Sequence, residues 1–82
     1  MTATAVLHRA HALDPDALRR HRRAAGMSLG DVAPHVGRAA SIVARYERGI
    51  IDPPASAVGI LAGLYGVDPG EFFTPATGPS TT

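Results

Sequence analysis

Glycine and proline occur at short intervals along the chain, and their spacing limits it to short helices. Nine glycines and seven prolines are spread over 82 residues. Asp14 followed by Pro15 predicts a helix start, because aspartate caps free N–H groups and proline suits the first helical turn. Gly26, Gly37 and Gly49 fall where helices would end in a left-handed residue. Since no segment alternates with the period of a strand, we predict an all-α fold.

Five short helices are predicted, at about residues 15–25, 28–36, 40–48, 54–65 and 69–73. Apolar residues recur at helical spacing within them and predict one shared core for a compact five-helix bundle. This inward set comprises Leu18, Leu29, Val32, Ala33, Val36, Val43, Tyr46, Val58, Leu61, Ala62 and Tyr65. The domain is expected at 14–73, after an arm or extra helix at 1–13 and before a disordered tail at 74–82.

Several classes of protein are not expected from this composition. The chain has no cysteine, which excludes a disulfide framework and thiolate metal sites. Its apolar runs are far shorter than the roughly 20 residues that span a bilayer, and no signal peptide is recognisable. We therefore expect no membrane association and a cytoplasmic protein, associated with the nucleoid when bound to DNA.

Catalytic and metal chemistry lack the residues they need. His8, His11 and His21 are not completed by a carboxylate or cysteine into a ligand set, so we expect no metal and no cofactor. No serine has a base placed to activate it, and a core this small leaves no room for a deep cleft. We expect the chain not to be an enzyme.

Positive charge is concentrated in the middle of the chain. The net charge is only +1, but residues 17–48 hold seven arginines against Asp31 and Glu47, which gives +5. Residues 1–16 contribute −1 and residues 49–82 contribute −3. Such an asymmetry favours a surface that faces a polyanion.

Two short helices joined by a glycine-containing turn form a unit that fits the major groove of DNA. Gly-Met-Ser at 26–28, Val-Ala at 32–33, Gly37 and Tyr-Glu-Arg-Gly at 46–49 extend this pattern. Pro53, Leu-Ala at 61–62 and Tyr-Gly-Val at 65–67 continue it. From Leu18 to Phe72, 55 residues, the chain resembles the Cro/lambda-repressor helix-turn-helix family, also called the xenobiotic-response-element family, without an insertion.

The resemblance implies a structural ion pair and a set of DNA contacts. The family's partly buried pair, between the first and third helices, matches Arg22 and Glu47, so Arg22 is not counted as a DNA contact. The family's base-reading and phosphate-contacting positions match Ala40, Ser41, Ala44 and Arg45, and Arg38 and Arg48, respectively. Backbone amides near Ser28 are a further candidate phosphate site, because a helix begins there.

Arg45 is the strongest candidate for reading a base, because its guanidinium can bond both acceptors of a guanine. Contact with phosphate or solvent is the alternative. Arg19, Arg20 and Arg23 either flank the phosphate site near Ser28 or form a solvated helix face.

Three residues or segments depart from the family pattern. Leu29 stands where the family often has a phosphate-binding glutamine, and Pro34 should kink or loosen the second helix. The helix at 40–48 begins with few polar groups, so specificity could also depend on DNA shape or on the N-terminal arm. That arm could reach the minor groove through Arg9, or pack on a partner as an extra helix.

The pattern favours a sequence-specific DNA-binding transcription regulator, and a repressor in particular. A homodimer on an inverted repeat of double-stranded DNA is the expected assembly, since two half-sites match two-fold symmetry. Its dimer surface is expected on the last two helices, with Phe72 and Phe73 exposed or half-buried there. The alternatives are an antitoxin-like or adaptor module whose main partner is another protein, and a purely structural helical bundle.

Overall fold

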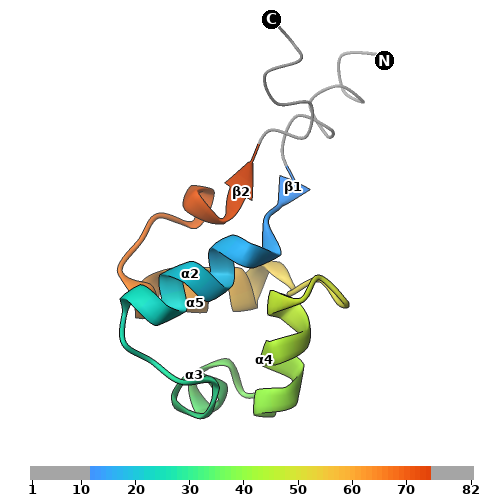
Figure 1. The fold of residues 1–82 in the computed structure, drawn as a ribbon, viewed down its shortest axis with the longest axis vertical. Coiled ribbons are helices and arrows are strands. Elements are labelled where there is room, and N and C mark those ends of the chain that lie inside the picture. Colours follow the sequence, from blue (N-terminus) through green and yellow to red (C-terminus); the bar gives the residue numbers. More distant parts are fainter. Residues whose placement is uncertain (1–11, 75–82) are drawn as a thin grey trace, which may run out of the picture.

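Four α-helices form the body of the molecule in the computed structural model, which describes residues 12–74 (Figure 1). They are α2 (Pro15–Ala24), α3 (Leu29–Val36), α4 (Ala40–Glu47) and α5 (Ala55–Tyr65). The all-α prediction is therefore confirmed in outline. The predicted fifth helix is wrong, because Pro69–Phe72 is a single 3-10 turn. The chain becomes extended again at Phe73, which leaves only four residues for that turn.

A small antiparallel sheet, which the sequence did not predict, closes the fold. Strand β1 (Ala12–Leu13) pairs with β2 (Phe73–Thr74), so that Ala12 faces Thr74 and Leu13 faces Phe73. Each strand has two residues, too few for an alternating pattern to be seen. Residues 12 and 13 are therefore neither part of a helix nor a free arm. The remaining predictions for the arm and the tail lie outside the described residues.

Local capping chemistry sets the helix ends as the sequence predicts. The Asp14 carboxylate accepts a hydrogen bond of 3.1 Å from the Asp16 amide at the start of α2. Gly37 ends α3 at φ +74°, in the left-handed region. Pro34 does not interrupt α3, which continues to Val36, so the expected loosening does not break the helix. A proline there removes one N–H donor, and the flanking turns remain bonded.

One core joins the four helices, and most of the predicted inward residues are buried in it. The buried members of the predicted set are Leu18, Val32, Ala33, Val43, Tyr46, Val58, Leu61, Ala62 and Tyr65. Leu29 and Val36 pack against this core while remaining half-buried.

Phe72 corrects the prediction that both phenylalanines lie at the surface. Its side chain is fully buried, because the 3-10 turn carries it inward between α2 and α5. It meets the rings of His21 and Tyr65 edge-on, with ring centroids 5.7 and 6.2 Å away. Phe73 remains 37% exposed.

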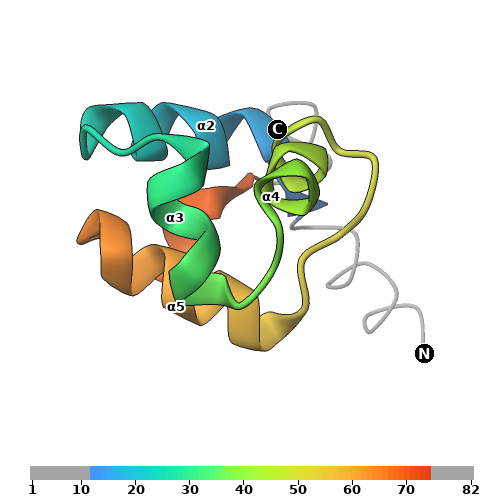
Figure 2. The ribbon, with the colours of Figure 1, turned by 90° about the horizontal axis from the view of Figure 1, so that it is seen from below.

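The arrangement places α3 and α4 together at one end of the molecule. In Figure 1 they lie at the end opposite β1 and β2. In Figure 2 α3 crosses between α2 and α5, and α4 lies beside it. Within residues 12–74, every helix is too short or too polar to cross a membrane.

Candidate nucleic-acid interface

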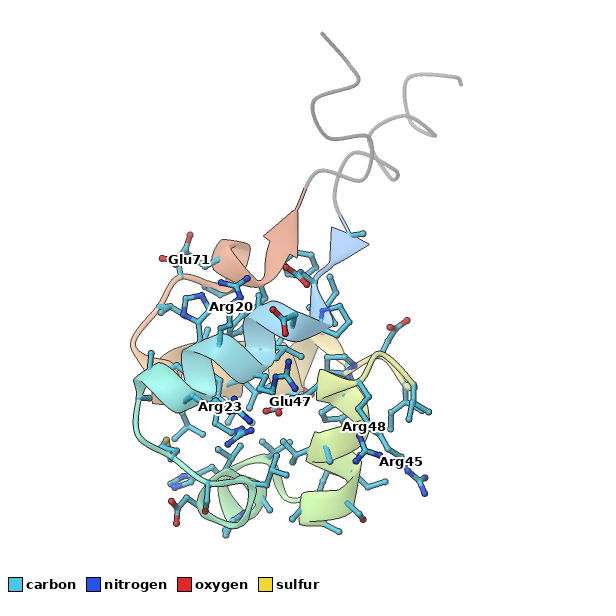
Figure 3. All side chains as sticks on the ribbon, viewed as in Figure 1. Arg20, Arg23, Arg45, Glu47, Arg48 and Glu71 are labelled. Atoms are coloured by element: carbon cyan, nitrogen blue, oxygen red, sulfur yellow. The ribbon has the colours of Figure 1, made fainter. Side chains whose placement is uncertain are left out.

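The unit formed by α3, a tight turn and α4 presents α4 at the surface. Val43 and Tyr46 are almost completely buried and fasten one side of α4 to the core. The other side carries Ser41 and Arg45, both exposed. In Figure 3 the Arg45 side chain points away from the body of the molecule. A helix with one side anchored and the other free has the form that enters a major groove.

The two alanines predicted on this face are less accessible than the sequence suggested. Ala40 and Ala44 are both half-buried. Ala40 packs against the edge of the core, because it begins α4 directly after the turn from α3. Their methyl groups are therefore available only in part, and Ser41 and Arg45 are the two exposed residues of α4.

Two further arginines lie just before and just after α4. Arg38 is exposed in the turn before α4, and Arg48 is exposed at the C-cap of α4. Within residues 12–74, Arg38, Arg45 and Arg48 form no side-chain hydrogen bond or ion pair. Three positive charges without an ion-pair partner among residues 12–74 thus lie on the accessible face of α4 and just before and after the helix.

Arg22 and Glu47, which the resemblance paired, are brought together by the fold. Arg22 donates from Nε to Glu47 Oε2 at 2.7 Å and from Nη2 to Glu47 Oε1 at 3.0 Å. Its third nitrogen donates to the Met27 carbonyl at 3.0 Å. The two side chains are only 11% and 6% exposed. The hydrogen bonds to Glu47 raise the pKa of Arg22 above its ordinary value, so the guanidinium keeps its charge.

Tyr65 stands behind this ion pair, and sequence reasoning missed its polar end. Its hydroxyl is buried, and no described residue accepts or donates a hydrogen bond there. Burial, followed by the charge of Glu47, raises the pKa of Tyr65 to about 12. The helical spacing predicted Tyr65 only as an apolar core residue, and no local pattern signals what lies around its hydroxyl.

Ser28 and Asp31 form a capping box at the start of α3. The Asp31 amide donates to Ser28 Oγ at 3.0 Å, and the Ser28 amide donates to Asp31 Oδ2 at 2.9 Å. The hydrogen bond from the Ser28 amide to the carboxylate, followed by the Ser28 hydroxyl, lowers the pKa of Asp31. The amide and the hydroxyl oxygen of Ser28 are therefore engaged in the cap. The next two amides, of Leu29 and Gly30, lie at the N-terminal end of the helix, where the helix itself offers no acceptor.

The three arginines of α2 other than Arg22 are of two kinds. Arg19 and Arg20 donate to the Asp16 carboxylate at 2.9 and 3.2 Å, and these bonds lower the pKa of Asp16. Arg23 is exposed and has no ion pair within the described part of the chain. The sequence could not distinguish them, because all three follow Asp16 on one short helix.

A cleft of about 220 Å³ opens between α2 and α4, and we call it the α2–α4 cleft. Its lining includes Arg22, Arg23, Leu29, Ala44, Glu47 and Arg48. No sequence pattern predicted it, because its walls come from segments about 20 residues apart in the chain.

A metal site is not formed by the residues that the structure describes. No three of their histidines, aspartates and glutamates lie close enough together to hold an ion. His21 instead faces Glu71 at 3.7 Å and packs on Phe72. His8 and His11 lie outside residues 12–74.

Comparison with known proteins identifies the family of the chain. Residues 16–72 match the model of a family described as "Helix-turn-helix domain". A protein of Pyrobaculum aerophilum named "Putative HTH-type transcriptional regulatory protein" is 39% identical over 56 residues. The match covers 68% of this chain but 22% of that relative, so the chain spans about a fifth of its length. No solved structure matched the chain. The chain belongs to the helix-turn-helix family, and within it to the Cro/lambda-repressor-like kind.

Proposed function

We propose that the chain is a sequence-specific DNA-binding transcription regulator that inserts α4 into the major groove. The observation that carries this proposal is the accessible face of α4, where Ser41 and Arg45 are exposed between the free arginines Arg38 and Arg48. The major groove is about 12 Å wide and admits one α-helix, and its base edges differ between all four base pairs. The family match and the name of the Pyrobaculum aerophilum relative support the same function.

Each residue of this face has a role in the proposal. Arg45 bonds the two acceptors of a guanine, and Ser41 donates to a base or a phosphate. Ala40 and Ala44 offer methyl contacts, for example with thymine. Arg38 and Arg48 contact phosphates on either side, and the amides beside Ser28 contact a third.

The proposed assembly is a homodimer that represses by occupying an inverted repeat in a promoter. Two copies are needed because one helix reads too few base pairs for useful specificity. Ile60 and Phe73 support this assembly, because both are large apolar side chains left about two-fifths exposed, at 40% and 37%. Sedimentation at micromolar concentration tests it, with Phe73→Glu expected to shift the dimer to monomer.

Selection of bound sequences from random duplexes tests the DNA-reading function. The expected result is an enriched inverted repeat whose half-site centres lie about 34 Å apart, one helical turn. Arg45→Ala should relax one position in each half-site. Arg20→Ala removes the same charge from the outer face of α2 and should leave the enriched sequence unchanged.

A selection that enriches no sequence would decide between the regulator and the adaptor function. If no sequence is enriched at moderate salt, the dimeric regulator is excluded for this chain alone. The adaptor function then becomes the better proposal. It has one observation in its favour, a groove of about 440 Å³ whose lining combines the apolar residues Leu13, Pro53, Val58 and Phe73 with Asp52.

A further inference from the structure

The α2–α4 cleft carries more positive charge than its ion pairs neutralise. Four arginines and one glutamate line it. The Glu47 carboxylate is occupied by Arg22 through both oxygens, and Arg19 is bonded to Asp16. Arg23 and Arg48 remain, and neither has an ion pair among residues 12–74. The cleft therefore has a surplus of two guanidinium charges.

Arg23 and Arg48 line the cleft from different helices. Arg23 belongs to the last turn of α2, and Arg48 caps the C-terminus of α4. Figure 3 shows Glu47 between them. Its carboxylate is 6% exposed and already bonded twice, so it repels an incoming anion little.

The remaining walls are neutral, and the cleft has room for a small anion. Leu29 and Ala44 provide apolar lining. A volume of about 220 Å³ is well above the space that a single water molecule needs. A phosphate group with part of its hydration shell fits such a space, and the fork of a guanidinium matches phosphate oxygens.

The position of the cleft relative to α4 indicates which anion reaches it. Ala44 lines the cleft and is the direct neighbour of Arg45 on α4. A helix in the major groove is bordered by the sugar–phosphate backbones, which supply most hydrogen bonds to the protein. With Arg45 in the groove, the cleft beside Ala44 would face one of these backbones.

We propose that the α2–α4 cleft seats a phosphodiester segment of double-stranded DNA, held by Arg23 on one side and Arg48 on the other. The inference rests on the proposed function. It adds Arg23 to the interface, a residue for which the sequence left open a phosphate contact or a solvated surface. It also separates Arg23 from Arg19 and Arg20, whose charges are bonded to Asp16.

The salt dependence of DNA affinity tests this site, because each phosphate contact adds about 0.9 to the slope of log K against log salt. The full chain, Arg23→Gln and the control Arg20→Gln are compared on one duplex of arbitrary sequence and on a selected one. Both variants lose one charge from the surface of α2. Thermal melting by circular dichroism first establishes that both fold as the parent does.

The expected result is a slope about 0.9 shallower for Arg23→Gln, with affinity reduced by the same factor on both duplexes. Arg20→Gln should keep the parent slope. Equal changes in the two variants would overturn the proposal, because overall charge and not the cleft would then set the affinity.

A second measurement separates this site from the proposed function. If the parent chain binds no duplex, the DNA-reading function fails, and inorganic phosphate is titrated while nuclear magnetic resonance follows the amides and arginine Nε–H groups. Shifts confined to Arg23, Leu29 and Arg48, and lost in Arg23→Gln, would support a phosphate site that serves a ligand other than DNA. Shifts that are absent or spread over all arginines would overturn the site.

Discussion

Arg22 and Glu47, 25 residues apart in the chain, are joined by two hydrogen bonds that fasten α2 to α4. The same arginine also reaches the Met27 carbonyl in the segment that leads to α3. One side chain thus connects three parts of the helix-turn-helix unit. The position of α4 therefore depends on an ion pair that does not itself contact the DNA bases in the proposed complex.

Removal of one partner of this pair should be strongly destabilising. We expect Arg22→Ala to lower the free energy of unfolding by about 3 kcal/mol, because Glu47 is left buried without its counter-ion. Urea denaturation measures the loss. Arg19→Ala is the matched control, since its pair with Asp16 is about half exposed and should contribute far less to stability. Equal losses would contradict the structural role of the buried pair.

The two adjacent phenylalanines should differ sharply. Phe72→Ala is expected to cost about 3–5 kcal/mol, because it leaves a cavity in the centre of the core. Phe73→Ala should cost clearly less, since this side chain is already 37% exposed. Urea denaturation of the two variants at low protein concentration compares them. A larger loss for Phe73→Ala would contradict the burial described above.

Replacement of glycine by alanine should have opposite effects on stability at Gly49 and at Gly59. Gly49 has φ +74°, and a Cβ there would lie 3.1 Å from Pro15 Cγ, so Gly49→Ala should destabilise by about 1–2 kcal/mol. Gly59 lies inside α5 with open space around it, and Gly59→Ala should stabilise by about 0.5–1 kcal/mol. Thermal melts of the two variants should move in opposite directions. A shift of both melting temperatures in the same direction would contradict these two expectations.

Tyr65 should ionise only in strong alkali and should weaken the fold there. Its pKa in the folded state is about 12, against 10 for the free side chain, so the unfolded chain loses this proton first. Its contribution to stability is complete below pH 10 and is lost as the pH rises toward 12. Tyr65→Phe should flatten the stability profile in this window. The variant should fold at pH 7 without loss, because the hydroxyl has no partner among the described residues.

Asp31 should contribute to stability in the opposite pH range. Its pKa is lowered by hydrogen bonds from Ser28, so the folded state favours the ionised carboxylate. This contribution is present above the ordinary pKa of 3.8 and is lost as the pH falls through the lower folded value. Acid titrations followed by circular dichroism should show a smaller pH dependence for Asp31→Asn. A profile unchanged from the parent would exclude the capping box as its source.

The local chemistry of helix ends was readable in the sequence, and pairings over long distances were not. Asp14 with Pro15, and Ser28 with Asp31, act within four residues, so their patterns predict the caps found. The pairing of Leu13 with Phe73 depends on two segments 60 residues apart, and it was missed. This omission also produced the error at Phe72, since the turn that buries it leads into β2.

The candidate site divides in the same way. Residues on one helix, such as Ser41 and Arg45, could be assigned to a common face from spacing alone. The pair of Arg22 with Glu47 was named only because of the family resemblance. Neither helical spacing nor the family resemblance predicted the α2–α4 cleft, because it forms only where α2 and α4 lie side by side.

The pairing of Ala12 with Thr74 has a consequence for how this domain can be joined to other proteins. Both ends of the described chain leave from a single pole of the molecule, and α4 stands at the other pole (Figure 1). A fusion partner joined directly at residue 12 or at residue 74 would therefore start from the pole that lies away from α4. The described domain is thus suited to insertion into a larger polypeptide without its junctions lying on α4.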